Sequence, residues 1–145
     1  MKIAFASDHV GYALKLELIE HCKSKGHEII DVGTHSNERV DYPVYGRKGA
    51  ETVASGEADA AILACGTGCG IMLAANTVKG VRCSNPSEPY TAKLSKEHNH
   101  ANAIAIGARV VGVDLAKMII DAWLEAELFG DRHAERVEIL KNMQI

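Results

Sequence analysis

Short apolar runs of strand length alternate along the chain with longer segments in which apolar residues recur at helical spacing. Boundary residues support this division, since Gly26 and Gly56 follow two of the helical segments and Asp131 stands where the last would be capped. The predicted strands cover residues 2–7, 28–32, 60–65, 80–83 and 103–106. The predicted helices cover residues 12–25, 41–55, 71–76, 87–97, 113–128 and 132–142.

This alternation predicts an α/β fold, a three-layer α/β/α sandwich around a five-stranded parallel sheet. The 145 residues suit a single domain covering 1–145. Sites in such sheets lie beyond the carboxyl ends of the strands. The helix at 113–128 is more apolar than one buried face requires, which favours contact with another subunit. The strand rule selects Asp8, His9 and residues 65–70, 83–87 and 107–109 as candidate site positions.

The composition is that of an ordinary soluble domain, with 47% hydrophobic and 24% charged residues. A net charge of −3 and few aromatic residues argue against a nucleic-acid surface. No apolar stretch is long enough to cross a bilayer or to act as a signal segment before Asp8, so we expect a cytoplasmic protein. In that compartment the cysteines should be reduced, with Cys22 and Cys83 as small core residues.

The stretch Ile62–Leu73, ILACGTGCGIML, places Cys65 where a strand gives way to a glycine-rich loop. Without side chains at Gly66, Gly68 and Gly70, the backbone can aim its amides at an anion. The dinucleotide fingerprint fails because Ile71 replaces its last glycine, and the phosphate-loop Lys-Ser/Thr pair is missing. The CxxxC spacing of Cys65 and Cys69 fits neither a thioredoxin-like pair nor structural zinc. We therefore interpret the loop as an anion cradle.

Cys65 adjoins this cradle. A free thiol is only slightly ionised at neutral pH, but a helix terminus and amide donors stabilise a thiolate. Cys65 is therefore a candidate base or nucleophile, the alternative being an inert cysteine at the end of a strand. Cys69, inside the following helix, is a candidate packing residue.

Two further clusters carry ionisable side chains. In KEHNHAN, residues 96–102, His98 suits general acid–base work, while a metal pair with His100 lacks a nearby carboxylate and solvated histidines remain an alternative. In GDRHAERVEIL, residues 130–140, Arg132 and Arg136 lie four apart and suit a phosphate group. A charged surface paired with Glu135 and Glu138 is the other interpretation of that helix.

Together, a base, an anion cradle, a histidine and paired arginines fit proton transfer next to a carbonyl on a small phosphorylated substrate. The motifs that carry these residues also resemble a known family over essentially the whole chain. SDHVGYALK, DVGTHS, VDYP, CGTGCGIMLAAN, SEPYTAKLSKEHNHAN, GARVVG and GDRHAERV closely resemble type B ribose-5-phosphate isomerases, a family that includes galactose-6-phosphate isomerase subunits. His100 departs from the Asp or Asn common in that family.

The resemblance implies a Rossmann-like fold without a dinucleotide, no cofactor and no metal, and a homodimer or dimer of dimers with sites at the subunit interface. It implies interconversion of D-ribose 5-phosphate and D-ribulose 5-phosphate through a cis-enediolate, with Cys65 as the base. His98 would open the furanose ring, assisted by Asp8 and Thr67. Substrate binding would involve Asp8, His9, Gly66, Thr67, Gly68, Cys69, Gly70, Asn99, Arg109, Arg132 and Arg136, with Asn99, Arg109 and His98 reaching across from the partner chain.

Three other functions remain open from the sequence. A hexose 6-phosphate, allose or galactose 6-phosphate, could replace the pentose, because pocket shape decides one carbon of length. A metal-dependent isomerase would need clustered carboxylates at strand ends, which the sequence does not offer. A non-catalytic module could bind a sugar phosphate with the same cradle.

Overall fold

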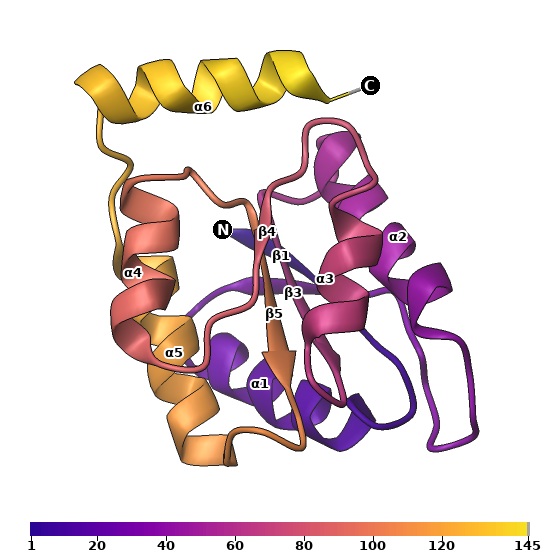
Figure 1. The fold of residues 1–145 in the computed structure, drawn as a ribbon. Helices are drawn as coiled ribbons and strands as arrows, with labels where there is room; N and C mark the ends of the chain where they lie inside the picture. The colour runs from indigo at the N-terminus through magenta and orange to yellow at the C-terminus, as the bar shows by residue number, and fades with distance from the viewer. Residues whose placement is uncertain (145) are drawn as a thin grey trace.

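The computed structural model describes residues 1–144 and confirms the predicted α/β sandwich (Figure 1). All strand pairs are parallel, and the strands lie in the order β2-β1-β3-β5-β4. The connections between them run through helices, as parallel strands require. The strands are β1 (Lys2–Ser7), β2 (Glu28–Asp31), β3 (Ala60–Cys65), β4 (Cys83–Ser84) and β5 (Ala103–Gly107).

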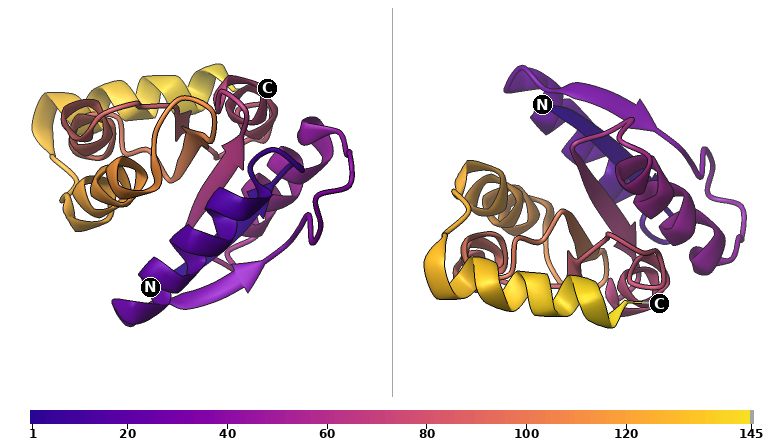
Figure 2. Two further views of the ribbon diagram at one scale, coloured as in Figure 1. Left: turned by 90° about the horizontal axis from the view of Figure 1, so that it is seen from below. Right: turned by 90° about the horizontal axis from the view of Figure 1, so that it is seen from above.

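Helices cover both faces of the sheet, which gives the three layers of a Rossmann-like fold (Figure 2). One face packs against α1, α4 and α5, and the other against α2 and α3. Within residues 1–144 no helix is long and apolar enough to span a membrane. The helices are α1 (Tyr12–Ser24), α2 (Tyr42–Ala54), α3 (Cys69–Ala75), α4 (Pro89–Glu97), α5 (Val113–Glu125) and α6 (Asp131–Met143).

The two sheet faces differ in side-chain size because successive strand residues point to opposite sides. Large side chains such as Phe5 and Ile62 pack toward α1 and α5, whereas the face toward α2 and α3 is mostly alanine. Small side chains let α2 approach closely: a Cβ at Gly49 would lie 2.6 Å from Cδ2 of Leu63. The α2/α3 layer is therefore held by close backbone approach.

The fourth strand is shorter than the predicted 80–83 segment, and that prediction is wrong in its bounds. Only Cys83 and Ser84 pair with β5. Upstream, the Gly80 amide donates to Oε1 of Gln144 at 3.0 Å and the Val81 carbonyl accepts from its Nε2 at 3.0 Å. A side chain at the end of α6 thus replaces a strand partner.

Boundaries of three helices also differ from prediction. The helix at 113–128 ends at Glu125, because the following segment leaves to bring the Phe129 amide to the Glu97 carbonyl at 2.9 Å. Asp131 does not cap α6; Gly130 is the capping residue and the helix start has no side-chain cap. The cradle helix begins at Cys69, two residues earlier than the predicted Ile71.

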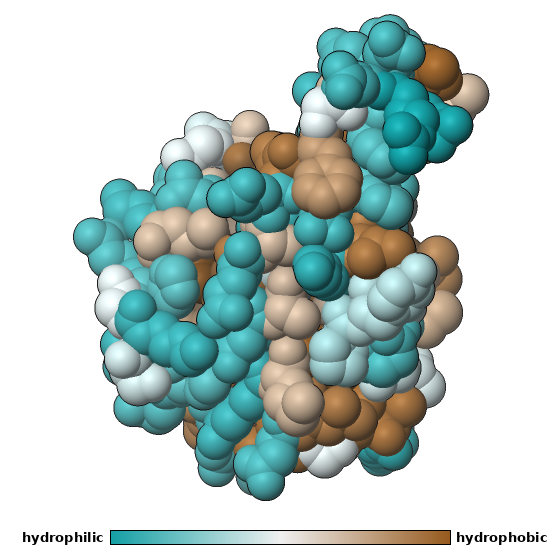
Figure 3. All heavy atoms as spheres, turned by 90° about the vertical axis from the view of Figure 1, so that its left-hand side faces the viewer, coloured by the Kyte–Doolittle hydropathy of each residue, from teal (hydrophilic) through white to brown (hydrophobic). Residues whose placement is uncertain are grey.

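Helix α6 lies across the amino edge of the sheet, opposite the end to which β5 points (Figure 1). It passes from the α4 side toward α3 (Figure 2) and is held by buried His133 and Val137 and by Gln144. Its outer surface forms a largely hydrophilic lobe at the top of the molecule (Figure 3). The paired arginines of this helix are therefore carried at the amino edge.

Candidate active site

The carboxyl edge of the sheet brings together the first group of predicted site residues. Cys65 ends β3 opposite Gly107 of β5, and Asp8 follows β1, whose last residue pairs with Ala64. The Asp8 amide donates to the Ala64 carbonyl at 3.2 Å. The strand-end rule therefore predicted, from sequence alone, that these residues lie together at this edge of the sheet.

The Cys65 thiol lies directly beside the backbone of the glycine loop. The Gly68 amide donates to its Sγ at 3.2 Å, and the residue is only 4% exposed. The following helix α3 has only seven residues, so the interaction that the structure places on the sulfur is the hydrogen bond from this amide rather than a helix dipole. An amide donor directed at the sulfur is compatible with a base or nucleophile, although reactive cysteines are generally more exposed than Cys65 is.

Gly68 must be a glycine for two independent reasons. Its φ of +81° lies in the left-handed region, which L side chains rarely adopt. A Cβ at this position would also overlap the Asn85 amide and approach the Gly107 nitrogen to 3.0 Å. Asn85, which donates to the Ala105 carbonyl at 2.9 Å, lies in the 83–87 loop that the strand rule selected, but no role was predicted for it individually. Only its place in the 83–87 loop could have indicated it.

The other cradle residues differ in what surrounds them. A Cβ added at Gly66 would make only ordinary contacts, one of them with Cδ of Arg109 in the same chain at 3.9 Å. Arg109 therefore lies at the carboxyl edge of the sheet, away from His98. Gly70 lies against the ring of Tyr42. Tyr42 is exposed and was not among the predicted site residues. The Cys69 amide donates to Oγ1 of Thr67 at 3.2 Å, and both residues are exposed. The prediction that Cys69 packs inside is therefore wrong.

Asp8 and His9 complete this group. Oδ1 of Asp8 accepts from the Gly11 amide at 2.9 Å, which orients a carboxylate that is 7% exposed. The Val40 amide donates to Nδ1 of His9 at 3.2 Å. Because Nδ1 accepts, the hydrogen of a neutral His9 is on Nε2, which leaves that atom as a donor for an anion.

The second group of predicted residues lies at the amino edge. His98 caps the end of α4, and its ring stacks on His133 of α6 with centroids 4.1 Å apart. The Phe129 ring lies 5.7 Å from the His98 ring on a tilted plane. A cavity of about 470 Å³ opens here, lined by His98 and residues 128–133. His133 and Phe129 had no predicted role, because stacking between distant segments leaves no local pattern.

The lining of this cavity carries both Arg132 and Asp131, and Arg136 lies one helical turn beyond. Arg132 and Arg136 are exposed on α6, and among residues 1–144 neither pairs with Glu135 or Glu138; Glu138 instead contacts Lys141 at 3.3 Å. Desolvation lowers the pKa of His133, and the nearby His98 and arginines lower it further. His133 is therefore neutral at pH 7, and the arginines remain available to an anion.

The two groups lie at opposite edges of one sheet. Asp8, His9, Cys65–Gly70 and Arg109 follow the carboxyl ends of the strands, whereas α4 returns antiparallel and delivers His98 and Asn99 to the amino edge. Asn99 is exposed there, close to α6. One chain therefore carries both halves of the predicted site without bringing them together.

The other described cysteines are ordinary thiols of the interior. Cys22 and Cys83 are buried, as predicted, and burial raises the pKa of Cys22 to about 11 and that of Cys83 further. Within residues 1–144 no three His, Cys, Asp or Glu side chains are grouped as a metal site would require. Cys65 is thus distinguished from the two buried core cysteines by its amide donor.

The fold and its carboxyl-edge loop define a Rossmann-like protein with an amide cradle in place of a dinucleotide fingerprint. The family described as Ribose/Galactose Isomerase matches residues 3–140, so the chain belongs to this family.

Individual relatives agree with this assignment. The chain is 55% identical to ribose-5-phosphate isomerase B of Escherichia coli over 139 residues, covering 96% of this chain and 93% of the relative. It is 43% identical to a galactose-6-phosphate isomerase subunit of Clostridium acetobutylicum, covering 99% and 82%.

Solved structures show the same fold. The Clostridium thermocellum ribose-5-phosphate isomerase B superimposes with a TM-score of 0.97 at 53% identity, covering 99% of this chain and 97% of the other. The Mycoplasma genitalium enzyme with bound ribulose 5-phosphate gives a TM-score of 0.92 at 35% identity, covering 97% and 94%.

Proposed function

We propose that this chain, folded as one domain, interconverts D-ribose 5-phosphate and D-ribulose 5-phosphate by proton transfer. The observation that carries the proposal is the Cys65 thiol at the end of β3 with the Gly68 amide on its sulfur. Identity of 55% to a relative named for this reaction supports the substrate. We place the protein in the cytoplasm, where free cysteines such as its own are maintained.

Cys65 acts as the base. Its thiolate takes the proton from C2 of the open-chain aldose, and the C–H electrons form the C1–C2 double bond as the C1 carbonyl becomes an oxyanion. The same sulfur returns the proton to C1 while the hydrogen of the C2 hydroxyl passes to the C1 oxyanion, so that C2 carries the ketone carbonyl and C1 a hydroxyl group. The near enclosure of Cys65 keeps water from competing for that proton.

The amides of residues 66–70 stabilise the enediolate. The left-handed turn at Gly68 directs the loop backbone toward the reacting end of the sugar. Each well-placed oxyanion donor contributes about 3–4 kcal/mol to transition-state stabilisation. Thr67, on the exposed side of the loop, and Asp8, on its buried side, bind the hydroxyl groups and the ring oxygen of the sugar.

Phosphate binding and ring opening fall to the other residues. The Nε2 hydrogen of His9 and the guanidinium groups of Arg132 and Arg136 bind the phosphate. His98 transfers the proton that opens the furanose ring, and Asn99 and Arg109 contact the substrate beside it. A half-buried imidazole stacked on a neutral His133 suits this acid–base role.

We propose that a complete site forms between two copies of the chain. The carboxyl-edge residues of one protomer and the amino-edge residues of its partner would supply the base, the cradle, the acid–base and the phosphate ligands. The separation of these groups across the sheet supports this arrangement, as does exposed apolar surface on α5 at Val113, Leu115 and Met118. Two such sites per dimer would follow from twofold symmetry.

A substrate panel tests the proposal. Purified protein is incubated with ribose 5-phosphate, allose 6-phosphate and galactose 6-phosphate, in water and in deuterated water with a chelator. We expect conversion of the pentose with solvent deuterium at C1 of the product and no effect of the chelator. Faster turnover of a hexose phosphate would reassign the substrate. Binding without turnover would identify a sensor instead.

A further inference from the structure

His98 takes its position from side chains that arrive from the α5–α6 connection. The His133 ring stacks on it at 4.1 Å with 12° between planes, and the Phe129 ring lies 5.7 Å away. Phe129 also lies 5.9 Å from His133, so the three rings form one cluster. Phe129 is 42% exposed, which means that burial alone does not fix its place.

The backbone of Phe129 is held from both sides of His98. Its amide donates to the Glu97 carbonyl at 2.9 Å, one residue before His98. Its carbonyl contacts Nε2 of His100 at 2.7 Å, two residues after His98. Because a carbonyl only accepts, Nε2 of His100 carries the hydrogen. We call this pair of hydrogen bonds the Phe129 clasp.

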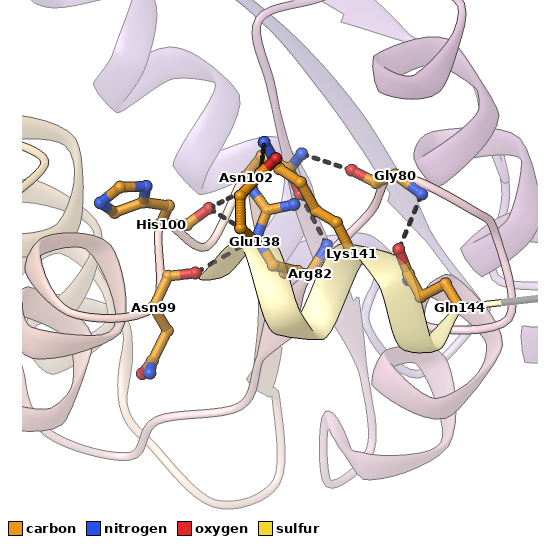
Figure 4. A network of polar contacts seen from close by, with 8 residues as sticks. All are labelled: Gly80, Arg82, Asn99, His100, Asn102, Glu138, Lys141 and Gln144. Atoms are coloured by element: carbon orange, nitrogen blue, oxygen red, sulfur yellow. Dashed lines mark hydrogen bonds and ion pairs between the residues drawn. The ribbon is translucent and has the colours of Figure 1, made fainter. Parts of the chain in front are cut away.

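His100 makes its hydrogen bond of the Phe129 clasp from an uncommon backbone conformation. Its φ of +49° is in the left-handed region, which is uncommon for residues other than glycine, although Asn, Asp and His adopt it more often than most. Its carbonyl accepts from Nη2 of Arg82 at 2.8 Å and from Nε at 3.2 Å, and its amide donates to the Lys96 carbonyl at 3.1 Å. Figure 4 shows the carbonyl directed at Arg82 and the ring pointing away from it.

Arg82 holds the backbone at Asn99 and His100 from the side opposite the His100 ring. Its Nε also contacts the Asn99 carbonyl at 3.2 Å, and its amide donates to Oδ1 of Asn102 at 2.8 Å. Gln144 holds the neighbouring Gly80 amide to the end of α6 (Figure 4). Strain at a single residue persists where the surroundings over-determine it, and such positions gather at functional sites.

We propose that His100 is a positioning residue for the isomerase reaction: through the Phe129 clasp it holds the His98 imidazole in the orientation required for ring opening. This inference rests on the proposed function, because it takes His98 as the ring-opening acid–base. It assigns a role to a position at which this chain departs from the Asp or Asn common in the resembling family.

Two substitutions separate the hydrogen bond from the backbone conformation. His100→Asn tolerates positive φ, but its amide is too short to reach where Nε2 lies. His100→Gln places an amide N–H near the former Nε2 and can renew the bond to Phe129. A purely conformational role predicts that the Asn variant is the better one, whereas the clasp predicts that the Gln variant is.

Two reactions separate His98 from Cys65. Conversion of ribose 5-phosphate requires ring opening, whereas exchange of the C1 hydrogen of ribulose 5-phosphate, an open-chain ketose, with deuterated water requires only the base and cradle. In His100→Asn we expect kcat on ribose 5-phosphate to fall about ten- to a hundredfold, as for a displaced catalytic group. The exchange rate and KM should stay within about twofold, and His100→Gln should recover most of the kcat.

The His98 ring resonances in the unliganded protein give a readout independent of turnover. Loss of the clasp should move them, since they sense the stacked His133 and Phe129 rings, and His100→Gln should return them toward wild type. Equal kcat in the Asn and Gln variants, an equal fall in conversion and exchange, or unmoved His98 resonances would overturn the role of His100. A wild-type protein that converts no pentose phosphate would instead overturn the proposed function.

Discussion

At the scale of single residues, the arrangement around Cys65 decides what the chain can do. The Gly68 amide touches the sulfur, the Gly68 φ of +81° makes that contact possible, and Asn85 closes the turn from behind. These features come from one short loop between β3 and α3. Two substitutions test separate parts of it.

Replacing the thiol should remove the chemistry and leave the fold intact. We expect Cys65→Ala to lower kcat by about a hundred- to ten-thousandfold, the contribution typical of a positioned base. Pentose phosphate binding, measured by calorimetry, should persist. Cys22→Ala provides the matched control, because it removes a buried core thiol on α1 and should lower the melting temperature without changing kcat per folded molecule. Near-native turnover by Cys65→Ala would contradict the assigned base.

Adding one methyl group to the cradle should cost both stability and turnover. Gly68→Ala forces a side chain into positive φ and against Asn85, so we expect a loss of about 2–4 kcal/mol in the free energy of unfolding. Gly56→Ala is the matched control, since Gly56 has a φ of +85° but nothing within 4 Å of the added carbon. Chemical denaturation measures both variants, and equal losses would show that crowding contributes nothing.

At the scale of elements, the sequence predicted what each segment could form better than where it ended. Short apolar runs and helical spacing identified the strands and helices, because a parallel sheet covered on both faces buries nearly every residue of its central strands. The ends of strands and helices were predicted wrongly where a residue from a distant segment determines them. Gln144 binds the backbone just before β4, and the hydrogen bond from Phe129 to Glu97 draws the chain away after α5. The strand rule selected the candidate residues at the strand ends and the 83–87 loop that contains Asn85. Tyr42, Phe129 and His133 depend on contacts between separate segments, which no local pattern shows.

A buried ammonium joins α1 to β2 beneath the loop that reaches His9. Lys15 is 1% exposed, and its Nζ donates to Oδ1 of Asp31 at 2.6 Å and to the Thr34 carbonyl. Lys15→Met should therefore lower the free energy of unfolding by about 2–4 kcal/mol, since it leaves Asp31, 27% exposed, without its cation. Lys23→Met removes an exposed ion pair with Glu20 and should change the free energy of unfolding by less than about 0.5 kcal/mol. Denaturant midpoints compare the two, and similar losses would refute the assignment.

The contact between α4 and α6 should weaken in acid. Desolvation, with the neighbouring cations, lowers the pKa of His133, so the unfolded chain, in which that pKa returns to about 6.5, binds a proton that the folded chain resists. The stabilising contribution is complete above about pH 6.5 and is lost as pH falls toward the lowered value. We expect the melting temperature to fall between about pH 7.5 and about pH 5.5 more steeply in wild type than in His133→Phe.

His133→Phe keeps an aromatic ring in the stack and removes its titration. His35→Phe is the surface comparison: it removes a 71% exposed histidine that lies 3.8 Å from Oδ2 of Asp31, and its melting temperature should still fall more steeply than that of His133→Phe. Parallel curves for wild type and His133→Phe would show that another group carries the acid sensitivity.

At the scale of the whole molecule, the sheet keeps the base and the arginine pair at opposite edges of each chain. If two copies complete each other's sites, complementary defects should cancel in a mixed dimer. Cys65→Ala and Arg136→Ala proteins, each inactive alone, should regain about a quarter of wild-type activity after denaturation and refolding together, since half of the dimers are mixed and one of their two sites is whole. Continued inactivity of the refolded mixture would contradict the shared site.

If two copies share each site as proposed, catalysis depends on association of the chains as well as on their fold. Within one chain, Cys65 ends β3 at the carboxyl edge of the sheet, whereas α6 carries Arg132 and Arg136 at the amino edge. Specific activity should therefore fall on dilution below the concentration at which protomers part, while far-ultraviolet circular dichroism per molecule stays constant. In a cell, flux through such an enzyme would then rise more steeply than in proportion to the amount of protein.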